Sequence, residues 1–205
     1  MEKHPRLGQS GPGDPRRDKV AYHEAGHAVI GTLVGMTVDT LTVEPTKDYL
    51  GLVTFAPFYD DNAIDLMNTS AVWGVVEGGE GGLLDSLPEL SDRIEATRQL
   101  CARDAVMLMA GPRAEERFTG KFDQSGARED LQKIRDFLRV FFCEYGDDEP
   151  AAWEAAQAHY GGPTIEEYLD DPLVWWWIMQ VAQTAYFGGD MTGDEVRALR
   201  PADLT

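Results

Sequence analysis

Apolar residues recur at helical spacing along most of the chain and at strand spacing in one short region. Start and stop residues bound six predicted helices, over 18–35, 91–118, 127–145, 151–159, 163–169 and 173–187. We expect Gly111-Pro112 to break or kink the second helix. Two runs rich in Val, Thr, Leu and Phe, at 37–43 and 50–56, predict antiparallel strands. The pattern therefore predicts a mainly α fold with a small antiparallel β-sheet near the N-terminus.

The predicted elements divide the chain into a leader and one domain. Residues 1–17 are polar and rich in Gly and Pro, which predicts a flexible leader, and we expect a single domain over 18–205. Within that domain, residues 57–90 hold two Gly-Gly pairs and few apolar periods, which indicates an irregular insertion. Residues 147–205 carry the C-terminal helices.

Composition and charge narrow the class of protein. The chain has 205 residues, and its 18 Lys and Arg against 36 Asp and Glu give a formal net charge of −18. Such a surface repels phosphate backbones and anionic lipids, so we expect no nucleic-acid partner. The longest apolar stretch, 173–179, is far shorter than the roughly 20 residues of a membrane helix. Because Cys101 and Cys143 form no CxxC pair, a reducing compartment is the simpler interpretation, and we expect a cytoplasmic protein without membrane insertion.

The residues most informative about chemistry form a complete HExxH motif at 23–27. On a helix, His23 and His27 are about 40° apart around the axis, so both imidazoles project from one face and can share a zinc ion. Glu24 lies about 100° round from His23, where it can act as a general base without binding the metal. Both histidines share the apolar face with Ile30 and Val34, which favours a buried site over a surface pair.

Two histidines do not complete a zinc site, which needs at least a third protein ligand. Asp130 is a candidate because it shares one narrow face of its predicted helix with Ile134, Phe137 and Phe141. A carboxylate on that core-facing stripe is costly unless it is neutralised, paired or bound to metal. From the spacing alone, a zinc ligand, a buried salt bridge and a helix cap all stay open.

Several segments, in the same order, resemble the zinc peptidase domain of the FtsH-type membrane AAA+ proteases. The helix around the motif at 23–27 resembles that family's HEAGHA helix, and the two predicted strands resemble the pair that follows it. The segment AGPRAEE at 110–116 is similar to the family's GGRAAE, and SGAREDL at 125–131 is similar to its GAxxDL. The resemblance covers residues 18–146.

This resemblance implies an FtsH-type, zincin-like helical peptidase fold with Zn²⁺ as cofactor. It implies His23, His27 and Asp130 as metal ligands and Glu24 as the catalytic base. Three protein ligands would leave a position open for water or a peptide carbonyl, as in a catalytic zinc site. The implied activity is that of a zinc metalloendopeptidase, with one of the predicted strands offering an edge to an extended substrate.

The family's peptidase is joined to an ATPase module and to membrane helices, and this sequence contains neither. We therefore expect a standalone, ATP-independent peptidase that acts on peptides and on flexible or unfolded polypeptides. A homo-oligomer and a separate partner ATPase both stay open. The alternative is a zinc-containing binding or regulatory module that no longer cleaves peptides, although the presence of Glu24 weighs against it. An adaptor without metal would need hydrogen bonds to satisfy His23 and His27.

Overall fold

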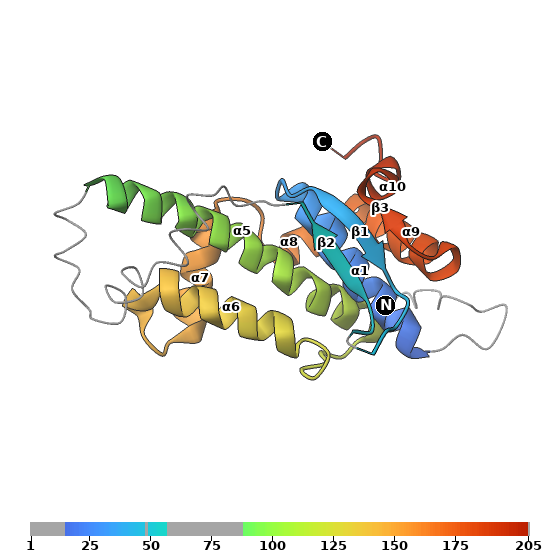
Figure 1. Ribbon diagram of the computed structural model, residues 1–205, viewed down its shortest axis with the longest axis horizontal. Helices are drawn as coiled ribbons and strands as arrows, with labels where there is room; N and C mark the ends of the chain where they lie inside the picture. The colour runs from blue at the N-terminus through green and yellow to red at the C-terminus, as the bar shows by residue number, and fades with distance from the viewer. Residues whose placement is uncertain (1–14, 48, 57–87, 205) are drawn as a thin grey trace.

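A computed structural model describes residues 15–47, 49–56 and 88–204. Residues 1–14 of the predicted leader and residues 57–87 of the insertion predicted over 57–90 lie outside the described residues. In chain order (Figure 1) the elements are α1 (Pro15–Leu33), β1 (Val38–Thr42), β2 (Leu52–Phe55), α5 (Pro88–Thr119), α6 (Arg128–Phe141), the 3₁₀ turn η1 (Cys143–Tyr145), α7 (Glu149–Tyr160), α8 (Ile165–Asp170), α9 (Pro172–Gly188), β3 (Met191–Thr192) and α10 (Gly193–Ala198). The predicted fold class, mainly α with a small antiparallel sheet, is confirmed.

The long helices α1 and α5 cross at the centre of the fold, where small residues let their backbones approach. A β-carbon added at Gly26 of α1 would lie 2.7 Å from the carbonyl oxygen of Ala110 and 2.7 Å from the β-carbon of Ala114. Both alanines are fully buried in α5. A crossing this close has no room for longer side chains, so it fixes which face α1 turns towards α5.

Aromatic packing joins α1 to α5 and to α9. The Tyr22 ring of α1 stacks on Phe118 of α5, with centroids 4.0 Å apart, and lies 5.7 Å from the ring of Trp175 in α9. Trp175 and Trp177 are buried, whereas Trp176 is 43% exposed, because three consecutive helical residues point in three directions. Although α9 carries no charged residue, neither it nor another described helix is long and apolar enough to cross a membrane.

The three strands form an antiparallel sheet in the order β2-β1-β3. The pairing of β1 with β2, in which Val38 lies opposite Phe55, confirms the predicted strand pair. β3 places Met191 opposite Leu41 and was not predicted, because two residues are too few to show an alternating pattern. Among the described strands β2 has one neighbour, so it lies at an edge of the described sheet.

Three predicted helix boundaries were wrong. α1 begins at Pro15, so the end of the predicted leader is helical; proline suits the first turn, where its missing N–H costs no intrahelical bond. α5 begins at Pro88 and continues through Pro112 to Thr119 without the predicted break. The internal proline costs about 3 kcal/mol, but the contacts of α5 with α1 on both sides of it outweigh that cost. The third predicted helix ends early, at Phe141, and tightens into η1.

Candidate metal centre

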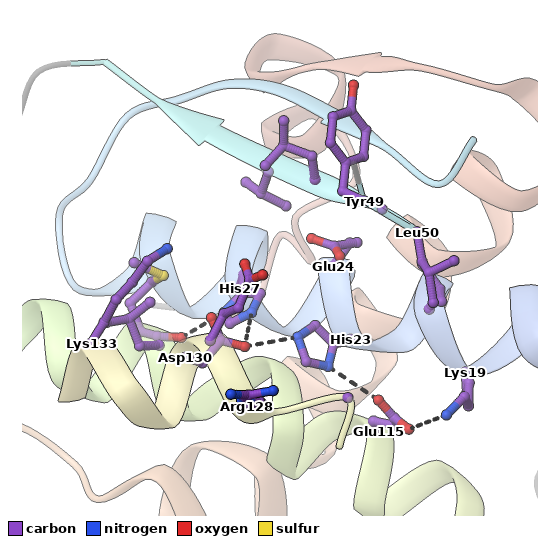
Figure 2. A pocket seen from close by; sticks show the side chains of 18 of the residues that line it. Lys19, His23, Glu24, His27, Tyr49, Leu50, Glu115, Arg128, Asp130 and Lys133 are labelled. Carbon is purple, nitrogen blue, oxygen red and sulfur yellow. Dashed lines mark hydrogen bonds and ion pairs between the residues drawn. The ribbon is translucent and has the colours of Figure 1, made fainter. Parts of the chain in front are cut away.

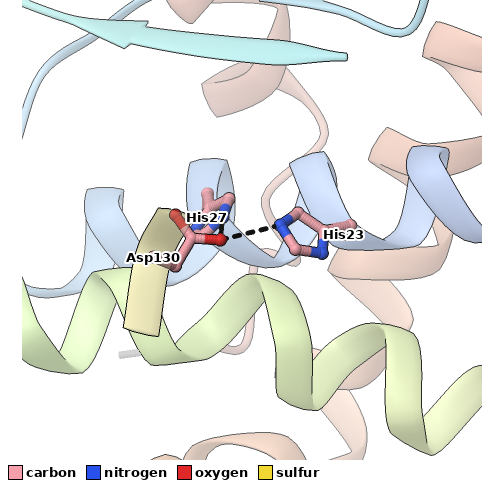
Figure 3. A group of neighbouring side chains, drawn as sticks. All are labelled: His23, His27 and Asp130. Carbon is pink, nitrogen blue, oxygen red and sulfur yellow. Dashed lines mark hydrogen bonds and ion pairs between the residues drawn. The ribbon is translucent and has the colours of Figure 1, made fainter. Parts of the chain in front are cut away.

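α1 and α6 bring His23, His27 and Asp130 together (Figure 3). The two histidines are buried and lie one turn apart on α1. Asp130 belongs to the first turn of α6, and its side chain is 14% exposed. One ligand atom from each residue lies within 4.8 Å of the others. The three residues proposed from the sequence as metal ligands are therefore neighbours in the fold.

The spacing of these atoms suits a zinc ion. Oδ2 of Asp130 lies 3.1 Å from Nε2 of His23 and 3.5 Å from Nε2 of His27. Donor atoms at zinc–ligand distances of about 2.0–2.2 Å around a tetrahedral ion are about 3.3 Å apart. Two imidazole nitrogens and one carboxylate oxygen are also donor types that zinc binds, and three protein ligands are the number found in catalytic sites. The donor set therefore fits zinc in chemistry, and the two distances from Asp130 to the imidazole nitrogens match the spacing of zinc ligands.

Each histidine is oriented through its other ring nitrogen by a group on α5. Nδ1 of His23 lies 3.1 Å from Oε2 of Glu115, and Nδ1 of His27 lies 2.9 Å from the carbonyl oxygen of Met107. A carbonyl oxygen accepts hydrogen bonds, so Nδ1 of His27 is the donor, and its Nε2 faces Asp130. Partners of this kind fix the ring orientation and the tautomer of metal-binding histidines.

The charges of the cluster are strongly coupled. Burial opposes the charged form of His23, but its hydrogen bonds with Asp130 and Glu115 outweigh burial and raise its pKa to about 9. Burial likewise acts to raise the pKa of the Asp130 carboxyl, but its contacts with His23 and His27 hold that pKa well below its usual range. In the metal-free protein a proton on His23 therefore balances the carboxylates. A bound cation would replace that proton, so metal binding and protonation compete.

Glu24 lies beside the cluster without joining it. The residue is 8% exposed, and Figure 2 places its carboxyl on the side of the segment that carries Tyr49 and Leu50. A β-carbon added at Gly51 would lie 2.7 Å from Cγ and 2.8 Å from Oε1 of Glu24, so the backbone before β2 passes directly over this side chain. Burial raises the pKa of Glu24, partly offset by the neighbouring histidines, and so favours proton uptake there.

An ion-pair network ties the connector before α6 to α1. Nζ of Lys19 lies 2.6 Å from Oδ2 of Asp123 and 3.3 Å from Oε1 of Glu115. Oδ1 of Asp123 accepts hydrogen bonds from two backbone N–H groups of the turn that follows it. The hydrogen bond between Lys19 and Asp123 raises the pKa of the amine and lowers that of the carboxyl. The network thereby holds the start of α6, and with it Asp130, against α1.

The cluster opens into a cavity of about 470 Å³ (Figure 2). One wall is formed by α6 and its connector, and the opposite wall by residues 49–53 and Phe55. Apolar side chains of the β2 strand and of α5 complete the lining: Leu52, Val53, Phe55, Met107 and Leu108. A cavity of this volume lies within the range of ligand-binding pockets.

Glu115 is the site residue that the sequence analysis missed. The segment 110–116 resembles the FtsH-type family, but no role was predicted for this acid. In the structure Arg113 and Glu116 pair with each other at 2.7 Å, and neither lines the cavity, whereas Glu115 contacts His23. The signal was present in the helical spacing, since Glu115 lies one turn after Gly111 on the face of α5 that contacts α1.

No protein-family model matches the chain. It is 30% identical over 128 residues to the ATP-dependent zinc metalloprotease FtsH of Protochlamydia amoebophila, a match that covers 62% of this chain and 10% of the relative. It is 30% identical over 149 residues to the protein of the same name in Rubrobacter xylanophilus, covering 72% and 18% respectively. It is 27% identical over 162 residues to the ATP-dependent zinc metalloprotease FtsH 2 of Methylacidiphilum infernorum, covering 78% and 20%.

These matches confirm the resemblance to the peptidase domain of the FtsH-type proteases. The matched regions span 62% to 78% of this chain but 10% to 20% of the relatives' own length. The chain is therefore related to one portion of proteins that are several times longer.

Proposed function

We propose that this relative of the FtsH zinc metalloproteases is a zinc-dependent metalloendopeptidase that hydrolyses peptide bonds in flexible or unfolded polypeptides without ATP. His23, His27 and Asp130 would hold Zn²⁺, and Glu24 would serve as the general base. The observation that carries the proposal is a buried Glu24 carboxyl beside a cluster of three suitable zinc donors, all lining one cavity.

A zinc ion held by the cluster would act as a Lewis acid: it would polarise the peptide carbonyl and lower the pKa of a bound water molecule. The chain contributes the arrangement of its donors. Glu115 and the Met107 carbonyl oxygen hold the imidazoles so that both Nε2 atoms face Asp130. Because these contacts are buried, the protein spends little free energy on ordering the ligands when the metal binds.

Glu24 has the properties of a group that moves a proton. Its raised pKa brings proton uptake closer to neutral pH, as catalytic bases require. In the proposed reaction Glu24 takes a proton from the attacking water and returns it to the leaving amine. A zinc site with a purely structural role would not require a buried carboxyl beside its ligands.

The β2 edge supports an extended polypeptide as the substrate. Its outer edge can pair with a peptide backbone whatever the side chains, which suits a sequence-tolerant enzyme. Leu50 and Leu52, which are 61% and 38% exposed, offer apolar contacts along the same wall. A cleft between one strand and one helix can bind a single extended polypeptide segment. Because a folded domain exposes few extended segments, flexible or unfolded polypeptides are the better substrates.

The proposed activity is assigned to one domain over 18–205 and is placed in the cytoplasm. The relatives are named ATP-dependent, but the proposed hydrolysis uses the cluster and Glu24 alone and consumes no nucleotide. The net charge of −18 supports a peptide partner over nucleic acid. A second copy of the chain or a separate ATPase would then govern delivery of folded substrates and not the hydrolysis itself.

The test is cleavage of unfolded, fluorescently quenched casein by the zinc-loaded chain. We expect cleavage by the wild type and by Glu154→Gln, a matched change at an exposed acid of α7, but none by Glu24→Gln with equal zinc content. Equal cleavage by Glu24→Gln would contradict the assigned base. No cleavage by any zinc-loaded form would favour the alternative, a zinc-containing binding or regulatory module.

A further inference from the structure

The charges that line the cavity differ from those of the whole chain. Four carboxylates and three cations line it, whereas the chain carries 36 acidic against 18 basic residues. Glu24 and Glu115 are buried, and the largely buried Asp130 faces the histidines. Lys19 is paired with Glu115 and with Asp123. These four cavity residues therefore have little charge to offer a bound peptide.

The charges left at the accessible wall belong to α6. Arg128 and Lys133 are exposed, line the cavity, and lie on either side of Asp130 along the helix (Figure 2). No described residue forms an ion pair with either of them, in contrast to Arg135 on the same helix, which pairs with Glu149 at 3.3 Å. Glu129 is the one carboxylate on this wall that is exposed. A peptide in the cleft therefore meets two available cations and one anion.

We infer that the cleft selects peptides with an acidic side chain close to the scissile bond, and that Arg128 and Lys133 are the residues that determine this specificity. The inference rests on the proposed peptidase function, since it assigns the substrate class of the same site. Successive side chains of an extended peptide point to opposite sides. A peptide paired with the β2 edge can thus turn an acidic side chain towards α6 while the next one contacts other walls.

At long range the net negative charge of the chain repels such a substrate. At short range, ion pairs with the cations of the cleft attract it. The net charge of −18 repels an anionic peptide, but at physiological salt this repulsion is screened beyond about 8 Å. Inside the cleft a peptide carboxylate can come within ion-pair distance of either cation. Two partly exposed ion pairs of this kind together give roughly a two- to thirtyfold preference.

The experiment uses three peptides that share one apolar centre and carry Glu, Gln or Lys at the flanking positions. Binding is measured by fluorescence anisotropy on zinc-loaded Glu24→Gln, and cleavage is measured with the zinc-loaded wild type. We expect the Glu peptide to bind and to be cleaved roughly two- to thirtyfold better than the Gln peptide, and the Lys peptide to be the poorest. The preference should shrink as salt is added.

Charge-reversal variants test whether Arg128 and Lys133 cause the preference for the Glu peptide. Arg128→Glu and Lys133→Glu should each lower the ratio of Glu-peptide to Gln-peptide binding, and together they should invert it. Arg139→Glu makes the same change at an exposed α6 position that does not line the cavity, and it should keep the wild-type ratio. Glu129→Gln should raise the ratio, because it removes the anion that competes for the two cations.

Equal binding of the Glu and Gln peptides, or preference for the Lys peptide, would overturn the inference. The inference would also be overturned if Arg139→Glu lowered the ratio of Glu-peptide to Gln-peptide binding as much as Lys133→Glu does. Acid-selective binding without cleavage by the wild type would uphold the specificity while contradicting the proposed catalysis. If none of the peptides binds or is cleaved, the inference fails together with the proposed function.

Discussion

The two halves of the candidate metal site are built differently. His23 and His27 lie on a helix that crosses α5 in the core, where Gly26 contacts Ala110 and Ala114. Asp130 comes from α6, where Glu129 before it is exposed and Leu131 after it is half-buried. What holds the start of α6 against α1 includes the ion pairs of Lys19, whose side chain is 28% exposed.

The histidine half depends on the stability of the whole domain, whereas the aspartate half can vary alone. A change at the α1–α5 crossing disturbs the core and the histidines together, because the same contacts serve both. A change at Asp130 or in the connector removes one donor while the core persists. Packing of α1 against α5 therefore positions the two histidines, whereas docking of α6 against α1 positions Asp130.

The largest expected effect comes from Gly111→Ala in the histidine half. A β-carbon at Gly111 would overlap the His27 imidazole, so either the ring or the helix must move. We expect loss of zinc binding and a fall of about 1–3 kcal/mol in the free energy of unfolding, measured by denaturant titration of the metal-free chain. Gly188→Ala, whose added carbon would meet open space, is the matched control. Unchanged zinc affinity in Gly111→Ala would contradict the claim that the packing of α1 against α5 positions the histidines.

Asp130→Ala removes the donor of the other half. We expect zinc binding and casein cleavage to be lost, while the unfolding transition of the metal-free chain shifts by less than it does in Gly111→Ala. Asp136→Ala changes an exposed acid of the same helix and should retain wild-type zinc affinity. Full zinc occupancy and activity in Asp130→Ala would show that Asp130 is not a ligand.

Glu115→Gln affects both halves of the site, because Glu115 contacts His23 and Lys19. Loss of a carboxylate that orients a metal-binding histidine lowers metal affinity by about 10- to 100-fold. We expect a loss in that range by competition with a zinc chelator. Glu116→Gln, next along α5 and paired with Arg113, should lose little. Similar losses in both variants would mean that the contact with His23 has no specific role.

Much of this site was predictable from the sequence, and the part that was not has a physical cause. The HExxH helix and the strand pair follow from local spacing, and Asp130 was recognised from its position on an apolar stripe and from the resemblance. Glu115 was missed because no contact between α5 and α1 was predicted from the sequence. Because α5 is continuous, Gly111 and Glu115 lie one helical turn apart and both face α1. Whether a helix survives an internal proline is decided by tertiary packing.

The smallest expected effect is the pH dependence of the metal-free chain. The pKa of His23 is raised to about 9 from its ordinary value of 6.5. His23 therefore adds stability that is fully present below pH 6.5 and is lost as the pH rises through about 9. Chelated wild type should become easier to unfold over this window, more so than chelated Glu115→Gln. With zinc bound, the slope should reverse, because protons compete with the metal. Equal slopes with and without zinc would contradict the assigned coupling.

The most direct test of the central claim is removal and return of the metal in the wild type. Chelated protein should leave unfolded casein intact, and one added zinc ion per chain should restore cleavage, with Glu24→Gln binding the same ion and staying silent. Cleavage by the fully chelated chain, or restored cleavage in Glu24→Gln, would contradict a zinc peptidase built on His23, His27 and Asp130 with Glu24 as its base.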